Sequence, residues 1–126
     1  MSESDFRILV CGSRTWSDAR LLDATLDRVA KNLTGKHRIV IVHGAARGAD
    51  RMADTWAKRR GWAREPHPAQ WDTYGKSAGP RRNQEMLDSD VHLVVAFRVN
   101  GKSPGTDHMV AAATRAGVGV VEVGPA

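Results

Sequence analysis

Cysteine is almost absent from this sequence of 126 residues, because Cys11 is the only one. A single cysteine excludes a disulfide within the chain, and it excludes a zinc site built from paired cysteines. Long apolar runs are missing too. The stretch from Val91 to Phe97 contains His92 and falls far short of the ~18 residues that a transmembrane helix needs. The sequence therefore excludes disulfide-stabilised scaffolds and predicts no contact with a membrane.

Prolines and aromatic residues are also scarce, with five of the former and seven of the latter. The remaining composition, 41% apolar and 26% charged residues, is that of an ordinary globular protein. A length of 126 residues suits one domain, so we expect residues 1–126 to form a single domain. The first residues, from Ser2 to Asp5, are acidic and lack the layout of a signal peptide, which predicts a cytoplasmic location.

Acidic residues are outnumbered by basic ones, 14 against 19, and the sequence pI is close to 10.0. Such an excess is typical of proteins whose partners carry phosphates. Arginine supplies 14 of the 19 basic residues, and guanidinium groups suit bidentate phosphate contacts better than ammonium groups do. A GC-rich genome produces the same preference for arginine, so the composition favours a phosphate-bearing partner only slightly.

Strand-like segments recur along the chain. Four runs rich in Val, Ile and Leu have the length of strands, at residues 6–11, 38–43, 91–97 and 118–123. Their nearly continuous apolar character is typical of strands covered on both faces of a parallel sheet. A weaker fifth strand is predicted at residues 62–65, just before Pro66.

Helical patterns fill the intervals between these strands. Ser17 is a suitable N-cap for a helix that runs toward Gly35 with apolar residues every three or four positions. Further helices are predicted at residues 50–60, 80–87 and from 106 or 107 to 116. The alternation predicts an α/β fold, a doubly wound and mostly parallel Rossmann-like sheet of about five strands in a three-layer αβα arrangement.

In such a sheet, ligands bind beyond the carboxyl ends of the strands, where the strand order reverses. The segments that follow the strands hold seven of the twelve glycines, namely Gly12, Gly44, Gly48, Gly75, Gly79, Gly101 and Gly105. They also hold the cations Arg14, Arg47, Lys76, Arg81, Arg82, Arg98 and Lys102. Loops are commonly rich in glycine and arginine. The clustering at one edge nevertheless favours a site for phosphate or another anion, because glycine lets backbone amides approach a ligand closely.

The segment from His43 to Asp50 joins a buried strand to a helix through Gly44 and Gly48, with Arg47 between them. This layout is typical of a phosphate cradle. It is not a Walker A loop, which needs Lys followed by Ser or Thr, and it lacks the three spaced glycines of the dinucleotide fingerprint. The Gly-Lys-Ser triplets at 75–77 and 101–103 lack the leading glycine of a P-loop, so we do not expect an ATPase.

Directly after the first strand, residues 12–16 offer the parts of a nucleotide site: an amide-rich turn at Gly12, the Ser13 hydroxyl, the Arg14 guanidinium and the Trp16 ring. Two roles are open for Trp16, because its ring can stack on a base or pack against the first helix.

Two later segments add further candidates for phosphate binding. Arg81, Arg82 and Asn83 stand at the start of a predicted helix, where two cations are unfavourable unless an anion is bound. Gly105 and Thr106 lead into the last helix, and the threonine hydroxyl can cap that helix, hold a phosphate, or do both.

Other reactive residues carry weaker expectations. His43, His67 and His108 fall near the expected cleft together with Asp50 and Asp107, but no pair has the spacing of a metalloenzyme motif, so we expect no metal and no cofactor. Cys11 ends a buried strand, which favours a small core residue over a nucleophile. Trp56 and Trp62 are expected to fill a core or a dimer surface.

Four motifs resemble, in order along nearly the whole chain, those of the SLOG superfamily, which is named for Smf/DprA and Lonely Guy proteins. The likeness is greatest to its YspA-type branch. The matching segments are residues 12–16, 43–50, 80–86 and 105–110. Ala45 and Pro104 stand where glycines are usual. The resemblance implies a Rossmann-like fold, a site for a nucleotide-derived ligand at the strand ends, and a homodimer.

Lonely Guy enzymes are phosphoribohydrolases that use an arginine in a motif similar to residues 82–86 and a glutamate three residues after the Gly-Thr threonine. Met109 stands at that second position, and a thioether cannot stabilise an oxocarbenium ion or direct a water. Arg82, with Asp50 or Asp107 as a substitute carboxylate, is therefore the candidate catalytic set of an alternative reading. Both aspartates are expected at helix starts, where capping amides would keep them ionised.

We thus expect first a protein that binds or senses a nucleoside phosphate or an ADP-ribose-like molecule. The alternative is a hydrolase of the N-glycosidic or phosphate bond of that ligand. A third possibility, single-stranded nucleic acid binding, is poorly served by seven aromatic residues. The expected ligand-binding residues are Gly12, Ser13, Arg14, Trp16, Gly44, Arg47, Gly48, Asp50, Arg81, Arg82, Asn83, Gly105 and Thr106.

Overall fold

The computed structural model describes residues 4–99 and 103–125. Ser2, Gly101 and Lys102, which the signal-peptide and P-loop comparisons used, lie outside the described residues. The elements follow in the order β1 (Ser4–Gly12), α1 (Ala19–Lys31), β2 (His37–His43), α2 (Ala49–Arg60), β3 (Ala63–Pro66), α3 (Trp71–Tyr74), η1 (Gly75–Ser77), α4 (Ala78–Leu87), β4 (Leu93–Phe97), α5 (Pro104–Arg115) and β5 (Gly119–Val123).

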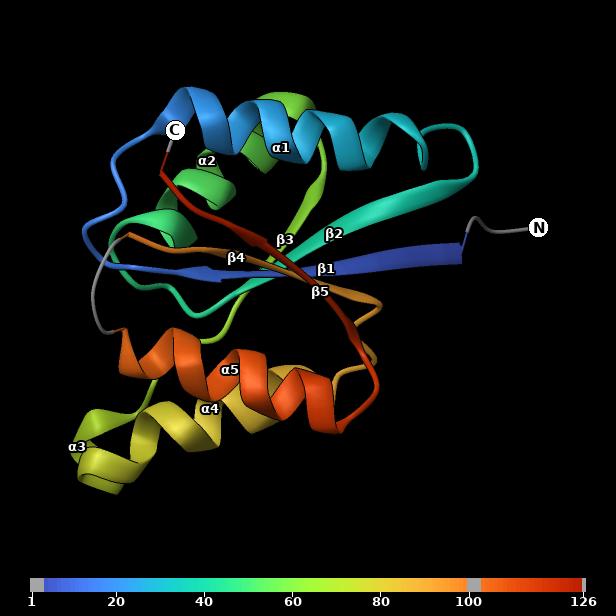
Figure 1. The fold of residues 1–126 in the computed structure, drawn as a ribbon. Helices are drawn as coiled ribbons and strands as arrows, with labels where there is room; N and C mark the ends of the chain where they lie inside the picture. Colours follow the sequence, from blue (N-terminus) through green and yellow to red (C-terminus); the bar gives the residue numbers. More distant parts are fainter. Residues whose placement is uncertain (1–3, 100–102, 126) are drawn as a thin grey trace.

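The strands form one parallel sheet in the order β3-β2-β1-β4-β5. In the centre, Ile8 of β1 pairs with Ile41 of β2 on one side and with Leu93 of β4 on the other. Helices α1 and α2 cover one face of the sheet, and α4 and α5 cover the other (Figure 1). The prediction of a doubly wound, Rossmann-like α/β fold is therefore confirmed.

Alternate residues of the strands enter two separate cores. On β1, Ile8 and Val10 pack toward α1 and α2, while Leu9 packs against Met86 and Met109 beneath α4 and α5. All five side chains are less than 3% exposed. Both faces of the inner strands are buried, so polar side chains are missing from both faces. The strand segments of the sequence are therefore nearly continuous apolar runs.

The capping residues of α1 and α2 show how the local sequence sets the ends of these helices. The N-cap of α1 is Asp18 and not Ser17, since the Asp18 Oδ1 accepts a hydrogen bond of 2.9 Å from the amide of Leu21. Helix α2 ends at Gly61, whose φ of +75° is the left-handed conformation that glycine adopts without strain. The short elements α3 and η1 were not predicted, because three or four residues cannot display a helical period.

Trp56 is fully buried and belongs to the core beneath α1 and α2. Its indole N–H donates a hydrogen bond of 2.9 Å to Asp27, which fixes the ring between α2 and α1. Of the two roles expected for Trp56, the core is therefore the correct one. No helix in the described part of the chain combines the length and the apolar character that a bilayer crossing requires.

Candidate functional site

A cleft of about 620 Å³ opens at the carboxyl ends of β1 and β4. In the sheet, β2 and β3 lie on one side of β1, and β4 and β5 lie on the other. The strand order therefore reverses between β1 and β4, and the loops after these two strands leave toward opposite faces of the sheet. Residues 12–15, 79–86 and 103–108 supply most of the lining. The volume is within the range of small-molecule sites.

Ser13 ties the two central loops together at the floor of the cleft. Its amide donates to the Phe97 carbonyl at 2.9 Å, and its hydroxyl accepts from the Val99 amide at 3.2 Å. The preceding residue must be glycine, because a Cβ at Gly12 would lie 2.3 Å from the Phe97 carbonyl oxygen and 2.8 Å from the Ala49 Cβ. The strand ends are thus held in a fixed spacing by main-chain contacts.

Arg82 reaches from α4 across to the loop after β2. Its Nη1 donates to the Gly44 carbonyl at 2.6 Å, and its Nε donates to the Asn83 side-chain oxygen at 3.0 Å. Burial lowers the pKa of Arg82; the negative charge of Asp50 opposes this effect and the positive charge of Arg14 adds to it. Among the described residues, Arg82 forms no ion pair with a carboxylate.

Arginines near the cleft have no carboxylate partner in the described part of the chain, unlike several arginines elsewhere on the surface. Arg59 pairs with Asp23 at 2.7 Å, and Arg98 pairs with Glu122 at 2.7 Å. Arg14 lines the cleft, yet within the described ranges it pairs with no carboxylate. The same holds for Arg47 and Arg51, which line an adjoining hollow of about 330 Å³ together with Arg14 and Arg82. The site therefore gathers four guanidinium groups that form no ion pair with a carboxylate among the described residues.

Asp50 lies in the cleft and faces the loop that precedes it. Its Oδ2 accepts hydrogen bonds from the amides of Gly44 at 3.0 Å and Ala46 at 3.2 Å. Burial raises the pKa of Asp50, and the two amides together with the charges of His43 and Arg82 lower it only in part. The amides that bond to Asp50 thus belong to the preceding loop and not to the first turn of α2, and desolvation outweighs their effect on its pKa.

Ala45 occupies the turn between these two amides. Its φ of +59° lies in the left-handed region, where the resemblance leads one to expect glycine. The loop keeps its path even though an alanine stands there.

Asn83 and Thr106 connect α4 to the first turn of α5. The Asn83 side-chain amide lies 3.3 Å from the Gly105 carbonyl oxygen and 3.1 Å from the His108 Nδ1. Thr106 is buried, and its hydroxyl accepts a hydrogen bond of 2.9 Å from the Ser103 hydroxyl. Ser103 is the N-cap residue of α5 but makes no side-chain hydrogen bond to the amides of the first turn. Such a helix start favours an anion.

Five predicted binding residues do not line this cleft, and Arg81 is one of them. Trp16 is only 3% exposed, and its ring packs 5.3 Å from that of Phe97, so of its two expected roles the structure shows packing. Gly48 precedes α2 with a φ of +79°, where a Cβ would lie 2.3 Å from the Ser13 carbonyl oxygen. Gly44 and Arg47 line the adjoining hollow instead.

Two charged candidates point elsewhere. The Arg81 guanidinium lies over the Tyr74 ring, 4.3 Å from its centroid, outside the cleft lining. The Asp107 carboxylate forms an ion pair with Arg98 and is 56% exposed. Of the two carboxylates suggested for catalysis, only Asp50 therefore lies in the cleft.

Trp71 is the cleft residue that sequence reasoning missed. It begins α3 and is 49% exposed, and it lines both the cleft and the adjoining hollow. Arg51 in the hollow was missed as well, because its position on α2 looks like that of any exposed helical arginine. The sequence did hold one signal for Trp71. Aromatic residues are rare in this chain, and this one stands in a segment where no helix or strand is predicted.

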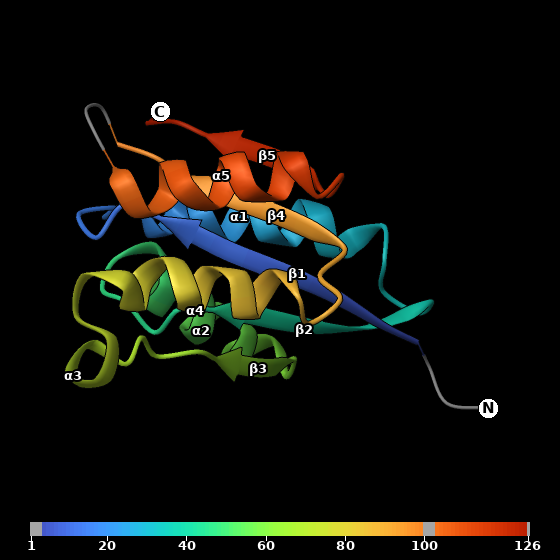
Figure 2. The ribbon, with the colours of Figure 1, turned by 90° about the horizontal axis from the view of Figure 1, so that it is seen from below.

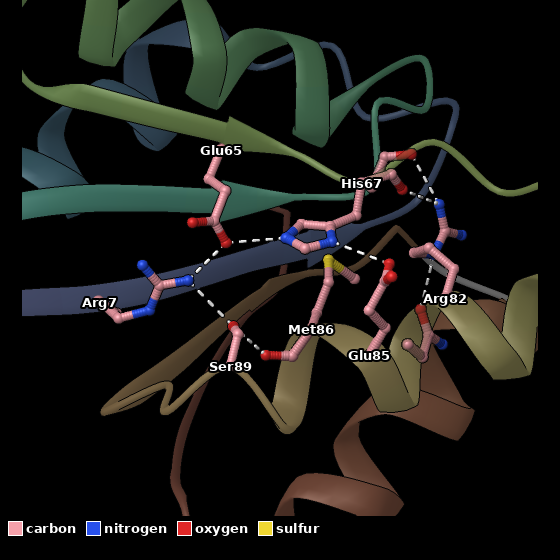
Figure 3. Close-up of polar contacts among 9 residues, drawn as sticks. Arg7, Glu65, His67, Arg82, Glu85, Met86 and Ser89 are labelled. Atoms are coloured by element: carbon pink, nitrogen blue, oxygen red, sulfur yellow. Dashed lines mark hydrogen bonds and ion pairs between the residues drawn. The ribbon is translucent and has the colours of Figure 1, made fainter.

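A chain of polar contacts runs behind Arg82, on the side of the sheet covered by α4 (Figure 3). The His67 ring lies between Glu65 at 2.8 Å and Glu85 at 3.0 Å, and Arg7 continues the chain from Glu65 at 2.5 Å. The His67 carbonyl oxygen accepts a weak hydrogen bond of 3.4 Å from Arg82. His67 therefore braces the loop that positions Arg82.

These contacts shift the pKa values of their members. The Arg7 hydrogen bond lowers the pKa of Glu65, with burial opposing and His67 assisting. Burial lowers the pKa of His67, but the hydrogen bonds to Glu65 and Glu85 outweigh it and leave that pKa raised. His67 thus carries its positive charge more readily than an ordinary histidine.

Other reactive groups are placed as follows. The histidines considered above as metal ligands, His43, His67 and His108, lie apart from one another. His43 bonds to Asp54 at 2.8 Å, and of the three only His108 lines the cleft. In the described ranges, no group of three or more His, Cys, Asp or Glu side chains is arranged to hold a metal ion. Burial raises the pKa of the Cys11 thiol well above its ordinary value, so this cleft residue is a protonated thiol and a poor nucleophile.

Comparison with known proteins gives three findings. Residues 6–74 match the model of the YspA, cpYpsA-related SLOG family. The Gene 61 protein of Mycobacterium phage D29 is 40% identical over 124 residues, which cover 94% of this chain and 96% of that protein. The C-terminal domain of a Pyrococcus furiosus hydrogenase superposes with a TM-score of 0.51 over 95% of this chain and 91% of that domain, at 16% identity. This last likeness concerns the fold alone.

Proposed function

This chain belongs to the YspA, cpYpsA-related SLOG family, and from that premise we propose that it binds a nucleotide-derived small molecule in the cleft beside β1 and β4. The ligand is a nucleoside phosphate or an ADP-ribose-like compound. Arg14, Arg82 and the turn at Gly105 and Thr106 hold its phosphate. Binding or sensing, and not turnover, is the role that we propose first.

The observation that carries this proposal is the pair of guanidinium groups of Arg14 and Arg82 at one cleft. The described residues provide neither group with an ion-paired carboxylate, and the charge of Arg14 disfavours the charged form of Arg82. A bound phosphate removes this repulsion and accepts charge-assisted hydrogen bonds from both groups. The uncapped first turn of α5 adds backbone donors beside them.

The first experiment is a calorimetric titration with adenosine monophosphate and with ADP-ribose. We expect Arg82→Ala to weaken binding by ~1.5–3 kcal/mol, the scale of a charge-assisted hydrogen bond, while the thermal transition stays cooperative. Arg59→Ala is the matched control, because Arg59 is 53% exposed and paired with Asp23. Equal losses from both variants would show that attraction by net charge, and not a site, holds the ligand.

Asp50 favours a second candidate function, hydrolysis of the N-glycosidic or phosphate bond of the same ligand. Asp50 is a carboxyl group in the cleft beside Arg82, and burial moves its pKa in the direction that a general acid requires. Arg82 would be the electrophilic anchor. Met109, where Lonely Guy enzymes carry glutamate, is instead fully buried in the core beneath α4 and α5. Asp50 is the one carboxylate that the described residues place in the cleft lining, and this ranks hydrolysis below binding.

Chromatography of the same mixtures tests the second candidate. We expect no free base or ribose phosphate above the control without protein. Steady turnover that disappears in Asp50→Asn but persists in Asp107→Asn would replace binding by hydrolysis. Asp107 serves as the control because it pairs with Arg98 outside the cleft.

We further propose that residues 1–126 act as one domain, in the cytoplasm and as a homodimer, without a cofactor. Nucleic acid is the weaker alternative as a partner. Single-stranded nucleic acid binding requires a row of stacking rings, and the exposed large aromatic residues in the described part of the chain are Trp71 and Tyr74.

A further inference from the structure

Trp71 differs from the other tryptophans of the chain in its exposure. Its side chain and backbone are 49% exposed, whereas Trp16 and Trp56 are 3% and 0% exposed. Trp62 packs against the core beneath α1 and α2. Burial of a large ring stabilises the other three positions, and this stabilisation is largely lost at position 71. The Trp71 ring is therefore explained by something other than the core.

The Trp71 ring forms part of the cleft wall next to α4. A Cβ at Gly79 would lie 3.4 Å from the ring carbon Cη2, so the ring rests against a residue without a side chain. Pro80 and Met86 add apolar surface to the same lining. Figure 2 shows the start of α4 between α3 and the start of α5. The cleft therefore joins an aromatic wall at α3 to the anion-favouring turn at α5.

The neighbouring aromatic residue on α3 is engaged differently. Tyr74 is 43% exposed, but the Arg81 guanidinium covers its ring at 4.3 Å. Tyr74 is also absent from the cleft lining, while Trp71 has no such cation over it within the described residues and does line the cleft. The two rings thus belong to the same short helix, but only the Trp71 ring lines the cleft.

We propose that Trp71 stacks on the base of the bound nucleotide, so that the site selects a base-bearing phosphate over a bare sugar phosphate. This inference rests on the proposed function, because it assumes that a phosphate is held at Arg82 and the start of α5. Stacking of a base on an aromatic side chain tolerates any base, since each base has a π-face. A volume of about 620 Å³ leaves room for a base beside the phosphate.

The test compares adenosine monophosphate with ribose 5-phosphate, which lacks the base, by calorimetric titration. We expect Trp71→Ala to raise the Kd for adenosine monophosphate about tenfold and to leave the Kd for ribose 5-phosphate within about twofold. Trp71→Phe, which keeps a ring, should retain most of the affinity for adenosine monophosphate. Tyr74→Ala is the matched control on the same helix and should change neither Kd.

The outcomes separate this inference from the proposed function. If the native protein binds neither of these compounds nor ADP-ribose, the proposed function fails and the stacking role fails with it. If both compounds bind and Trp71→Ala weakens them equally, or weakens neither, only the stacking role is overturned. A change of oligomeric state in Trp71→Ala without a change in either Kd would assign the ring to a subunit contact and also overturn the proposal.

Discussion

Gly44 separates two ionisable side chains of the site, Asp50 and Arg82. Its amide donates to Asp50 and its carbonyl oxygen accepts from Arg82. A Cβ at this position would lie 2.4 Å from the Arg82 Nη1 and 3.1 Å from the Asp50 Oδ2. The nearest atom is the end of a flexible side chain, so an added methyl group displaces the Arg82 guanidinium before it disturbs the backbone.

Gly44→Ala should therefore damage binding more than folding. We expect its affinity for adenosine monophosphate to fall about tenfold, since one charge-assisted hydrogen bond is lost, and its free energy of unfolding to fall by less than about 1 kcal/mol. Calorimetric titration and urea unfolding measure the two effects.

Gly12→Ala provides the contrast, because its Cβ would meet the carbonyl oxygen of Phe97 at 2.3 Å. A clash with backbone cannot be relieved by rotating a side chain, and we expect a loss of about 1–3 kcal/mol in unfolding free energy. A Gly44→Ala protein that unfolds as readily as Gly12→Ala, or that binds like the native chain, would contradict this account of Gly44.

At the level of elements, the loop after β3 and helix α4 are joined by His67. Its ring contacts Glu65 of β3 and Glu85 of α4 (Figure 3). Arg7 of β1 donates to Glu65, and Arg82 of α4 donates to the His67 carbonyl oxygen. The pKa of His67 is raised above the ordinary value of 6.5 because the hydrogen bonds to Glu65 and Glu85 outweigh burial. The bridge therefore stabilises the fold most when His67 is protonated.

This arrangement predicts how stability depends on pH. A raised pKa in the folded state gives stabilisation that is complete below the ordinary value of 6.5 and disappears as the pH rises through the folded value. Between about pH 6 and about pH 8, the native protein should lose up to about 1 kcal/mol relative to His67→Gln, as for a partly exposed ion pair. Urea unfolding across this range makes the measurement, and parallel curves for the two proteins would refute the role of His67.

Helices and strands differ in how well the sequence predicts them. Strands and long helices were predicted because burial on both faces, or on one stripe, imposes a repeating pattern on the residues of each element. Helix α3 has four residues, too few for a period, so Trp71 was not assigned to the site. Trp16 was ambiguous because the residues next to it in the sequence do not show whether its ring faces the cleft or Phe97.

Contacts between distant residues were also beyond the reach of the sequence. The contacts of Arg81 and Asp107 could not be predicted because their partners, the Tyr74 ring and Arg98, become neighbours only in the folded chain. The raised pKa of Asp50 depends on burial by several elements, which a helix-cap pattern does not reveal. The positions of the site loops, by contrast, followed from the order of strands and helices alone.

For the whole molecule, a homodimer is the expected assembly, although Trp56 offers it no surface because it is fully buried. Val121 lies on the edge strand β5 and is 39% exposed. An edge strand with exposed apolar residues favours association. Sedimentation equilibrium at micromolar concentration should give about twice the chain mass of 13.7 kDa, and a single species near 13.7 kDa would remove the dimer.

The central position of β1 has a consequence for how the site forms. Residue 8 pairs with residue 41 on one side and with residue 93 on the other. The two walls of the cleft therefore come together only through a strand pairing between positions that are 85 apart in the chain. Closing so long a loop is among the slowest steps in folding. A chain that is still being synthesised can pair β1 with β2 before β4 exists, but the second wall of the cleft, and with it the proposed binding site, forms only when β4 docks against β1.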